Sequence, residues 1–443
     1  MKVFSTYSAK ITNHREIFVN TVLVYRNAVN FYIKVSLEEW DTISAIECSL
    51  LRQQYVERIS HRTGKNPGPK YDFDKDFYKF PSYLRRSAIS EAIGKVSSYK
   101  SNLKSWNALP YNLKGKKPSL PKAGHTFPCM YKTVMYEETG TYTVKIKIYT
   151  RRTWDWVDIT LKKSDVNYIR CHCASRKQCA PTLMKRHKNW FLDFPFEETC
   201  HLKEKNISER IVAAVDLGIN SAATVSIMKS DGTIIGRHFL KLPKEQDSLN
   251  HALNRIKKAQ QHGNRRTPRL WAKAKGINDD IAVKTASFII NTAKRYKADV
   301  IVFEALDKKG KKHGRSKQKL HMWKSQYVQR MVTDKAHRLS MRISHVCAWN
   351  TSRLAFDGSG RVLRGKEADL NNYSVCKFTT GKVYNCDLSA SYNIGSRYFV
   401  RELLKSLSVK AGLALRANVP RAAKRSTCTL STLISLNAEL MSA

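Results

Sequence analysis

Acidic residues are scarce in this sequence. Its 443 residues include 36 Asp and Glu against 79 Lys and Arg, which gives a formal net charge of +43. A folded chain sustains such an imbalance when a polyanion neutralises it, either nucleic acid or an anionic membrane surface. Membrane binding predicts a basic amphipathic helix or a long apolar run, and no run approaches the roughly 18 residues that a span needs. The composition therefore favours a nucleic-acid partner over a membrane.

The sequence also lacks a secretory segment and paired cysteines. No apolar stretch follows the start Met1-Lys2-Val3, and the ten cysteines are scattered. These features predict a protein of a reducing compartment, here the cytoplasm with association to the nucleoid, rather than a disulfide-bonded secreted protein. With 42% apolar residues in periodic patterns, the chain is long enough for two or three folded domains.

The first half combines strand-like and helix-like patterns. Residues 1–8 alternate as a strand, and a helical apolar pattern follows from residue 14 to about residue 37. Helical sequence continues through residues 84–106, and short strands are expected at residues 142–149, 154–161 and 190–196. We therefore expect a β-rich domain at residues 1–40 and 110–205, with a helical domain at residues 41–109.

The second half places three carboxylates at the ends of predicted elements. An apolar run ends in Asp216, and two further strands follow at residues 222–228 and 233–240. A helix then leads to the strand ADVIVF, which Glu304 follows directly, and Asp387 opens a late helix that runs to about residue 404. This order of strands, helices and acids is that of an RNase H-like fold, which brings the three acids together.

Three clustered carboxylates suit one particular chemistry. Ionised carboxylates are hard oxygen ligands that favour Mg²⁺ or Mn²⁺ over zinc. Two such ions about 4 Å apart can activate water and stabilise the leaving oxygen of a phosphodiester. Taken singly, Asp216 could be a turn former and Asp387 a helix N-cap. Glu304 is the stronger single candidate, because an unpaired acid is costly at the end of a buried strand.

Basic residues concentrate in two stretches of the second half. Residues 247–275 are helical in pattern, and a loop follows near residues 308–319. Such side chains suit phosphate contacts, although any single one more often belongs to a solvated helix face. The nucleic-acid contacts that we predict are Arg255, Lys257, Lys258, Arg265, Arg266, Arg269, Lys311, Lys312 and Arg315.

At the three acids the sequence resembles a known family. VDLGIN around Asp216, VFEAL around Glu304 and NCDLSASYNI around Asp387 resemble the three RuvC motifs of the TnpB proteins. These are transposon-encoded, RNA-guided DNA nucleases related to compact type V CRISPR effectors. YRNAVN at residues 25–30, WFLDFPF at residues 190–196 and TSR at residues 351–353 resemble further family signatures, so the similarity extends to about residue 400.

The resemblance implies an α/β architecture with a discontinuous nuclease domain. A RuvC-like domain would comprise residues 206–350 and 381–405, with a target-binding insertion at residues 351–380 and a C-terminal tail at residues 406–443. A β-barrel-like wedge domain at residues 1–40 and 110–205, interrupted by a helical recognition domain at residues 41–109, would precede it. The implied partners are a guide RNA and a double-stranded DNA target with a short flanking motif, bound by a monomer or homodimer.

The same resemblance implies that Asp216, Glu304 and Asp387 are catalytic and bind the metal cofactor. The implied cofactor is Mg²⁺ or Mn²⁺, with two ions in the site. Two alternatives remain open. A guide-independent resolvase or transposase would need the acids but not the large basic first half. A guide-directed repressor that has lost cleavage is disfavoured, because all three acids are present.

The insertion departs from the family pattern. Two Cys-x-x-Cys pairs usually bind a structural zinc there, but the first pair is absent and the second is reduced to Cys376, with Cys386 out of register. Two thiols cannot supply four tetrahedral ligands. Another group, Cys171, Cys173, Cys179 and His187, has suitable side chains but no zinc-like spacing, which favours structural cysteines on strands.

We therefore expect the purified protein to contain well under one zinc per chain, as measured by elemental analysis. Stoichiometric zinc that disappears when Cys376 and Cys386 are both replaced would contradict this expectation, since it would show that the insertion recruits ligands from elsewhere in the chain.

Overall fold

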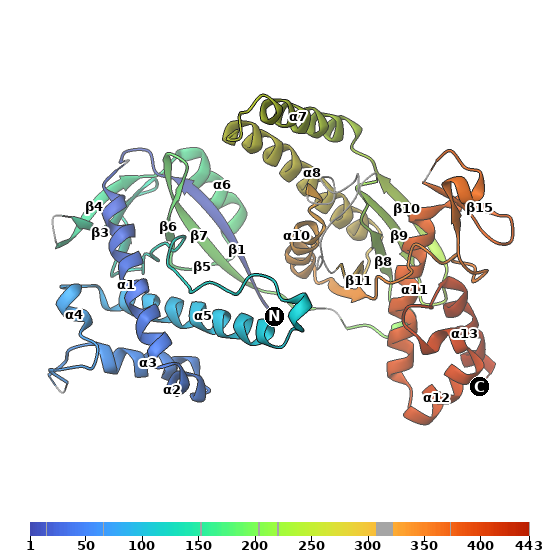
Figure 1. Cartoon of the computed structure of the whole chain (residues 1–443), viewed down its shortest axis with the longest axis horizontal. Helices are drawn as coiled ribbons and strands as arrows, with labels where there is room; N and C mark the ends of the chain where they lie inside the picture. Colours follow the sequence, from blue (N-terminus) through green and yellow to red (C-terminus); the bar gives the residue numbers. More distant parts are fainter. Residues whose placement is uncertain are drawn as a thin grey trace. The chain divides into compact units, whose positions relative to one another are not determined.

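The computed structural model describes the whole chain except residues 15, 65, 151–152, 203, 219–220, 307–321, 373 and 443. The chain divides into two compact units, an N-terminal unit of Phe4–Glu198 and a C-terminal unit of Thr199–Ala443 that includes Met1–Val3. Figure 1 shows the elements of each unit. No helix in the described part of the chain is both long enough and apolar enough to cross a membrane.

The N-terminal unit contains two antiparallel sheets and a group of helices. Its strands are β1 (Lys2–Lys10), β2 (Tyr136–Glu138), β3 (Thr143–Thr150), β4 (Thr153–Thr160), β5 (Lys177–Gln178), β6 (Thr182–Arg186) and β7 (Asn189–Thr199). Its helices are α1 (Phe18–Glu38), α2 (Trp40–Ala45), α3 (Ser49–Ser60), α4 (Phe73–Asp76), α5 (Ser82–Asn107) and α6 (Lys163–Cys173), with a 3-10 turn η1 (Tyr111–Leu113). The strands and long helices expected from the periodicity are present.

The expectation of a barrel-like wedge is wrong. One sheet has the order β2-β3-β4, and the other has β1-β7-β5 with β6 also paired to β7. An isolated bridge between Ile11 and Leu161 links them, but the described strands do not close into a barrel. The edge strands β2 and β5 have only three and two residues, too few to complete a ring of paired strands.

One continuous core holds the helices and sheets of this unit together. The apolar stripe of α1, which includes Phe18, Tyr25 and Tyr32, is buried with the inward-facing residues of both sheets. Phe18 packs edge-on against Trp190 of β7, with ring centroids 5.3 Å apart. The alternation and helical spacing seen in the sequence therefore correspond to the residues that are buried here.

The expectation that Cys171, Cys173 and Cys179 lie on strands is wrong. Cys171 and Cys173 lie on α6, and His187 lies in the β6–β7 turn with φ at +54°. Helix α6 begins with Lys163-Ser164-Asp165, and Asp165 accepts a hydrogen bond from the Lys10 amide at 3.1 Å. Its acidic first turn is a local helix-start signal in the sequence.

The C-terminal unit is built on a five-stranded sheet of order β10-β9-β8-β11-β12. Strands β8, β9 and β10 are antiparallel neighbours, whereas β11 and β12 run parallel to β8. Their bounds are β8 (Val212–Asp216), β9 (Ala223–Met228), β10 (Ile234–Leu240), β11 (Val300–Glu304) and β12 (Arg342–Val346). This sheet reproduces the strands expected from the sequence.

Helices cover both faces of this sheet (Figure 1). The helices of this unit are α7 (Pro243–Gln261), α8 (Pro268–Arg295), α10 (Ser325–Arg338), α11 (Cys386–Ser406), α12 (Val409–Asn418) and α13 (Leu430–Ser442), with 3-10 turns η2 (Ile207–Glu209), η3 (Gly365–Ala368) and η4 (Pro420–Ala423). Helix α11 shares one apolar cluster with the even-numbered residues of β8 and β11. Helices α8 and α10 share the other cluster with the odd-numbered residues.

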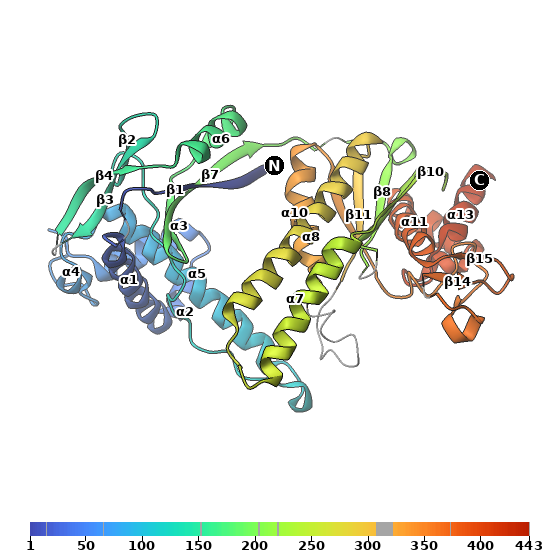
Figure 2. The ribbon, with the colours of Figure 1, turned by 90° about the horizontal axis from the view of Figure 1, so that it is seen from above.

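The basic stretch at residues 247–275 is not the single helix that its pattern predicted. It forms parts of α7 and α8, which lie side by side as a hairpin (Figure 2). Gly263 adopts φ of +81° in the connection, and Pro268 occupies the first turn of α8. Both residues are turn signals, because Gly tolerates positive φ and Pro cannot continue a preceding helix. The break therefore falls at residues 262–267.

The C-terminal tail belongs to the core of this unit. Leu430, Leu433 and Leu436 of α13 are buried in the apolar cluster of α11, and α12 adds Leu415. Residues after Ser406, whose role the sequence left undefined, thus cover part of the outer side of α11.

Candidate active site

Two of the three predicted acids end adjacent parallel strands. Asp216 is the last residue of β8 and Glu304 is the last residue of β11. Phe303 pairs with Val215 in this register, so Glu304 lies beside Asp216 at the carboxyl edge of the sheet. The carboxyl edge of a parallel pair is where polar side chains from separate strands converge.

Alternation along the strands directs both acids to the same face. Val212 and Ala214 of β8, with Val300 and Val302 of β11, contribute to the apolar cluster that includes α11. Residues two apart on a strand share a face, so Asp216 and Glu304 continue these two rows toward α11.

Asp387 reaches the same place from α11. It lies in the first turn of this helix, where the Asn385 side chain caps the helix by accepting a hydrogen bond from the Leu388 amide at 3.0 Å. Helix N-termini favour negative charge, because their amide groups point outward and the helix dipole is positive there. The sequence-predicted acids are therefore brought together by three separate elements.

The pKa values of Asp216 and Glu304 are both shifted from their usual values. Burial raises the pKa of Asp216 well above its usual value, and the negative charges of Glu304 and Asp387 raise it further. Burial also raises the pKa of Glu304, whereas the Thr351 hydroxyl and the Arg397 charge lower it. Like charges that share a site disfavour each other's ionised form. These shifts show that the acids are electrostatic neighbours.

The donor set suits a hard divalent cation, because carboxylate oxygens are the ligands that Mg²⁺ and Mn²⁺ prefer. Within the described ranges, no three His, Cys, Asp or Glu side chains lie close enough together to form a complete metal-binding group. The three acids are therefore suitable ligands for such a cation, but their side chains in the described structure are not close enough together to count as a metal-binding group.

Several polar residues fix the surroundings of Glu304. The Thr351 hydroxyl hydrogen-bonds the Glu304 carboxylate, and Gln329 of α10 donates to the Glu304 carbonyl at 2.9 Å. Arg397 is buried and donates to the carbonyls of Cys347, Trp349, Ser426 and Cys428. Arg364 lowers the pKa of Asp216.

Sequence reasoning named Thr351 only as part of a motif and missed both arginines. For Arg397, the signal was a basic residue on the buried side of an amphipathic helix. Arg364 carried no such signal, because its position depends on how the insertion folds.

A solved structure has a similar fold. The structure of Cas12f1 in complex with single-guide RNA and target DNA has a TM-score of 0.56 with this chain, at 13% identity, covering 86% of this chain and 81% of that one. In sequence, the TnpB-like protein aq_aa05 of Aquifex aeolicus (strain VF5) is 29% identical over 239 residues, which is 48% of this chain and 74% of that protein. The chain is thus similar in sequence to a TnpB-like protein and in fold to a Cas12-type protein.

Two further sequence matches cover smaller parts of the chain. Residues 5–150 match the Aq_aa04 family. The uncharacterized protein aq_aa04 of Aquifex aeolicus (strain VF5) is 38% identical over 80 residues, or 18% of this chain and 44% of that protein. The TnpB relationship inferred from the three motifs is therefore confirmed.

The segment of residues 351–386, which contains the expected insertion, has an apolar core. Strands β13 (Leu363–Arg364), β14 (Val375–Lys377) and β15 (Val383–Asn385) form a small antiparallel sheet. Cys376 and Cys386 are buried with Phe378 and hydrogen-bond each other through their thiols. The ring of Phe356 packs 5.5 Å from that of Phe378. The two thiols thus contribute to packing, and the low zinc content remains a prediction.

The predicted nucleic-acid contacts fall into two groups. Those in the described chain are exposed on α7, on α8 and in the turn between them: Arg255, Lys257, Lys258, Arg265, Arg266 and Arg269. Lys311, Lys312 and Arg315 lie outside the described residues. The exposed group is available to phosphates, because none of its members is buried by packing.

The charge repulsion at the acids has a measurable consequence for stability. Because the folded-state pKa of Asp216 is raised, its ionisation costs folding free energy at neutral pH. We expect Asp216→Asn to raise the melting temperature of the C-terminal unit by about 2–4 °C, corresponding to about 1 kcal/mol, in EDTA at pH 7. Asp247→Asn, which removes an exposed acid from α7, should leave the melting temperature unchanged. An equal or lower melting temperature for Asp216→Asn would contradict the described repulsion.

Proposed function

We propose that this protein is an RNA-guided DNA endonuclease whose RNase H-like (RuvC) core hydrolyses phosphodiester bonds at Asp216, Glu304 and Asp387. The observation that carries the proposal is the convergence of these carboxylates from β8, β11 and α11 at one edge of the sheet. The strand order β10-β9-β8-β11-β12, with only the last two strands parallel to β8, is the order expected for an RNase H-like core.

In this proposal the three acids hold two divalent cations, Mg²⁺ or Mn²⁺. When bound, the ions would supply Lewis-acid stabilisation and a more acidic water for attack on phosphorus. Thr351 keeps the Glu304 carboxylate oriented through its hydroxyl, and Gln329 fixes the backbone at the end of β11. Arg364, whose guanidinium attracts the Asp216 carboxylate and donates to the Ser352 carbonyl, would use its remaining N–H groups to bind a phosphate oxygen of the bound strand.

The proposed partners are a guide RNA and a double-stranded DNA target. In such a complex base pairing reads the sequence, while the protein contacts backbone and a short flanking motif. The exposed basic residues of α7 and α8 would contact phosphates, which position the nucleic acid without specifying its sequence. The Cas12f1 complex that shares this fold contains both a guide RNA and target DNA.

The remaining parts of the chain take their proposed roles from the same comparison. We assign wedge and recognition functions to the N-terminal unit, with the helices of residues 41–109 as the recognition part. Residues 351–380 would form the target-binding insertion, which the apolar cluster around Cys376 and Phe378 holds together. The charge of +43 gives the whole chain the electrostatic attraction to nucleic acid that these roles need.

The acid site can be tested by substitution. Asp216→Ala, Glu304→Ala and Asp387→Ala should each abolish DNA cleavage, a loss of at least about 1,000-fold, because each removes a ligand of the proposed metal site. Nucleic-acid binding should stay largely intact, because the basic surface supplies it. Cleavage of labelled DNA in Mg²⁺ or Mn²⁺, with EDTA as the metal-free condition, measures the first effect, and gel shift measures the second.

Asp231→Ala is the matched control for these variants. Asp231 lies in the tight turn between β9 and β10, in the same sheet, where its carboxylate accepts a hydrogen bond from the Thr233 amide. This variant should cleave at the wild-type rate. Full cleavage by any one of the three acid variants would remove that residue from the site.

The RNA partner can be identified directly. At a charge of +43 the protein should purify from its native host with bound RNA. Sequencing should find one dominant RNA with a structured scaffold and a variable end, and DNA matching that end should be cleaved. A scaffold from a transposon end would indicate a TnpB-type nuclease, whereas one from a CRISPR array would indicate a type V effector.

Heterogeneous RNA that competes with DNA and directs no cleavage would overturn the guided function and favour a resolvase-like enzyme. Salt supplies the control for nonspecific binding. Nonspecific complexes should weaken steeply between about 50 and 200 mM salt, whereas a guide complex with many contacts should survive purification in that range.

A further inference from the structure

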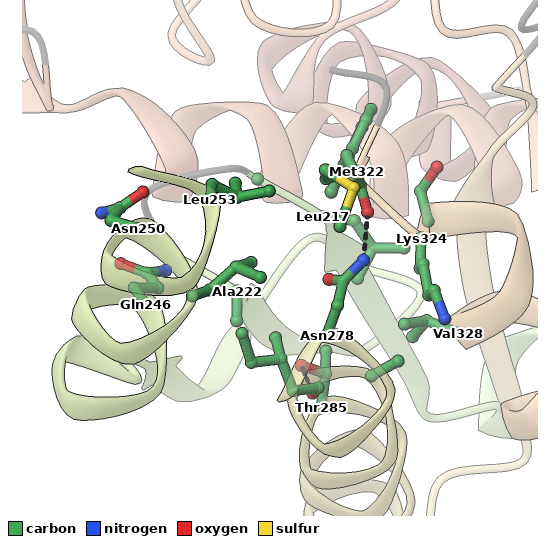
Figure 3. Close-up of a pocket in the computed structure, with 16 residues that line it drawn as sticks. Leu217, Ala222, Gln246, Asn250, Leu253, Asn278, Thr285, Met322, Lys324 and Val328 are labelled. Carbon is green, nitrogen blue, oxygen red and sulfur yellow. Dashed lines mark hydrogen bonds between the residues drawn. The ribbon is translucent and has the colours of Figure 1, made fainter. Parts of the chain in front are cut away.

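A cavity of about 120 Å³ lies at the base of the α7–α8 hairpin (Figure 3). Its walls come from both helices, from the segment that follows β8 and from the start of α10. In the close-up, Gln246 and Asn250 of α7 lie across the cavity from Asn278 and Thr285 of α8. The space is sufficient for several water molecules or for one ring-sized group.

The lining has the chemistry of a site for a neutral, planar and polar group. Leu217, Leu253 and Val328 are among its apolar walls, and amide and hydroxyl groups are interspersed between them. None of the described lining residues is an acid, a histidine or a cysteine, so a metal ion would find no anionic ligand and no zinc-type ligand. Lys324 is the charged lining residue, and its ammonium pairs with Asp279. An anionic ligand would therefore meet mostly apolar surface, at a high desolvation cost.

One buried polar group in the wall has no partner. The Ser325 side chain is 1% exposed, and within the described chain its hydroxyl makes no hydrogen bond. Leaving such a group unsatisfied costs about 1–3 kcal/mol, so a ligand that bonds it is favoured. Asn278, another lining residue, is held in place because its amide donates to the Met322 carbonyl at 2.6 Å.

The cavity begins directly beyond the acid site. Leu217 and Gly218, which line it, follow Asp216 at the end of β8. Val215 and Leu217 belong to the apolar cluster of α8 and α10, whereas Val212 and Ala214 pack toward α11. The acids and the cavity thus occupy opposite faces at the same end of β8.

We propose that this cavity binds one unstacked nucleobase of the nucleic acid that passes the acid site. The inference rests on the proposed function for its ligand, since a chain charged +43 is expected to bind nucleic acid. Apolar walls accept the faces of a base, and the amides of Asn and Gln suit the donor and acceptor edge of a base. The Ser325 hydroxyl supplies a further hydrogen bond at the buried end.

The test compares two single strands of about 12 nucleotides, one of thymidine and one with abasic sugars, which carry equal charge. Affinity is measured by fluorescence anisotropy with the full-length protein in EDTA, so that nothing is cleaved. We expect the wild type to bind the thymidine strand about tenfold more tightly than the abasic strand. Ser325→Ala should reduce this preference about threefold to tenfold by removing one hydrogen bond.

Asn250→Phe should abolish the preference by filling the mouth of the cavity from an exposed position on α7. Asn254→Phe is the matched control, because Asn254 is exposed on the same helix and lies outside the lining. It should keep the wild-type preference. Unchanged affinity for the abasic strand shows that each variant is folded.

A thymidine preference that persists in both Ser325→Ala and Asn250→Phe would come from another part of the chain and would overturn the proposal. Equal binding of the two strands by the wild type would also overturn it and leave the cavity as a packing defect. Neither result depends on cleavage. A failed acid site would leave these affinities unaffected, and a failed base site would leave the cleavage assay unaffected.

Discussion

Negative charges confined to one edge of a buried sheet are the constraint on which the C-terminal unit depends. Asp216 and Glu304 end neighbouring strands, and Asp387 begins the helix that packs over them. Burial and mutual repulsion both disfavour their ionised forms, as the raised pKa of Asp216 shows. The fold must therefore hold this edge by contacts elsewhere, because the acids themselves contribute no net attraction.

Helix α11 supplies most of those contacts. Its residues from Leu388 to Val400 are buried, and a Cβ at Gly395 would lie 3.1 Å from the Cβ of Ala214, so the glycine permits the helix to approach β8 closely. Arg397, two residues further along, donates to carbonyls of the segment after β12 and of the C-terminal tail. Its buried charge is thus satisfied by backbone oxygens, and it also attracts Glu304. The tail and the acid site are therefore stabilised by the same side chain.

Local periodicity was sufficient to predict much of this architecture. The strands that end at Asp216 and Glu304 and the helix that begins near Asp387 could be predicted, because strand ends and helix caps are local features of the sequence. The α7–α8 break was missed although Gly263 and Pro268 are local signals, because the continuous basic pattern outweighed them. Arg364 could not be predicted, since its position beside Asp216 depends on the long-range folding of the insertion. The cavity at Ser325 likewise needs four separate segments to form.

Apolar packing joins the insertion to the acid site. Phe378, Cys376 and Cys386 are buried in a common cluster, and burying this apolar surface favours the folded state of the segment. Its core continues into α11, because Phe356 packs 5.2 Å from Tyr392 and the Tyr384 hydroxyl lies 3.0 Å from that of Tyr392. Since Cys386 directly precedes Asp387, a movement of the insertion would act on the start of α11. The insertion is therefore coupled mechanically to one acid and, through Arg364, electrostatically to another.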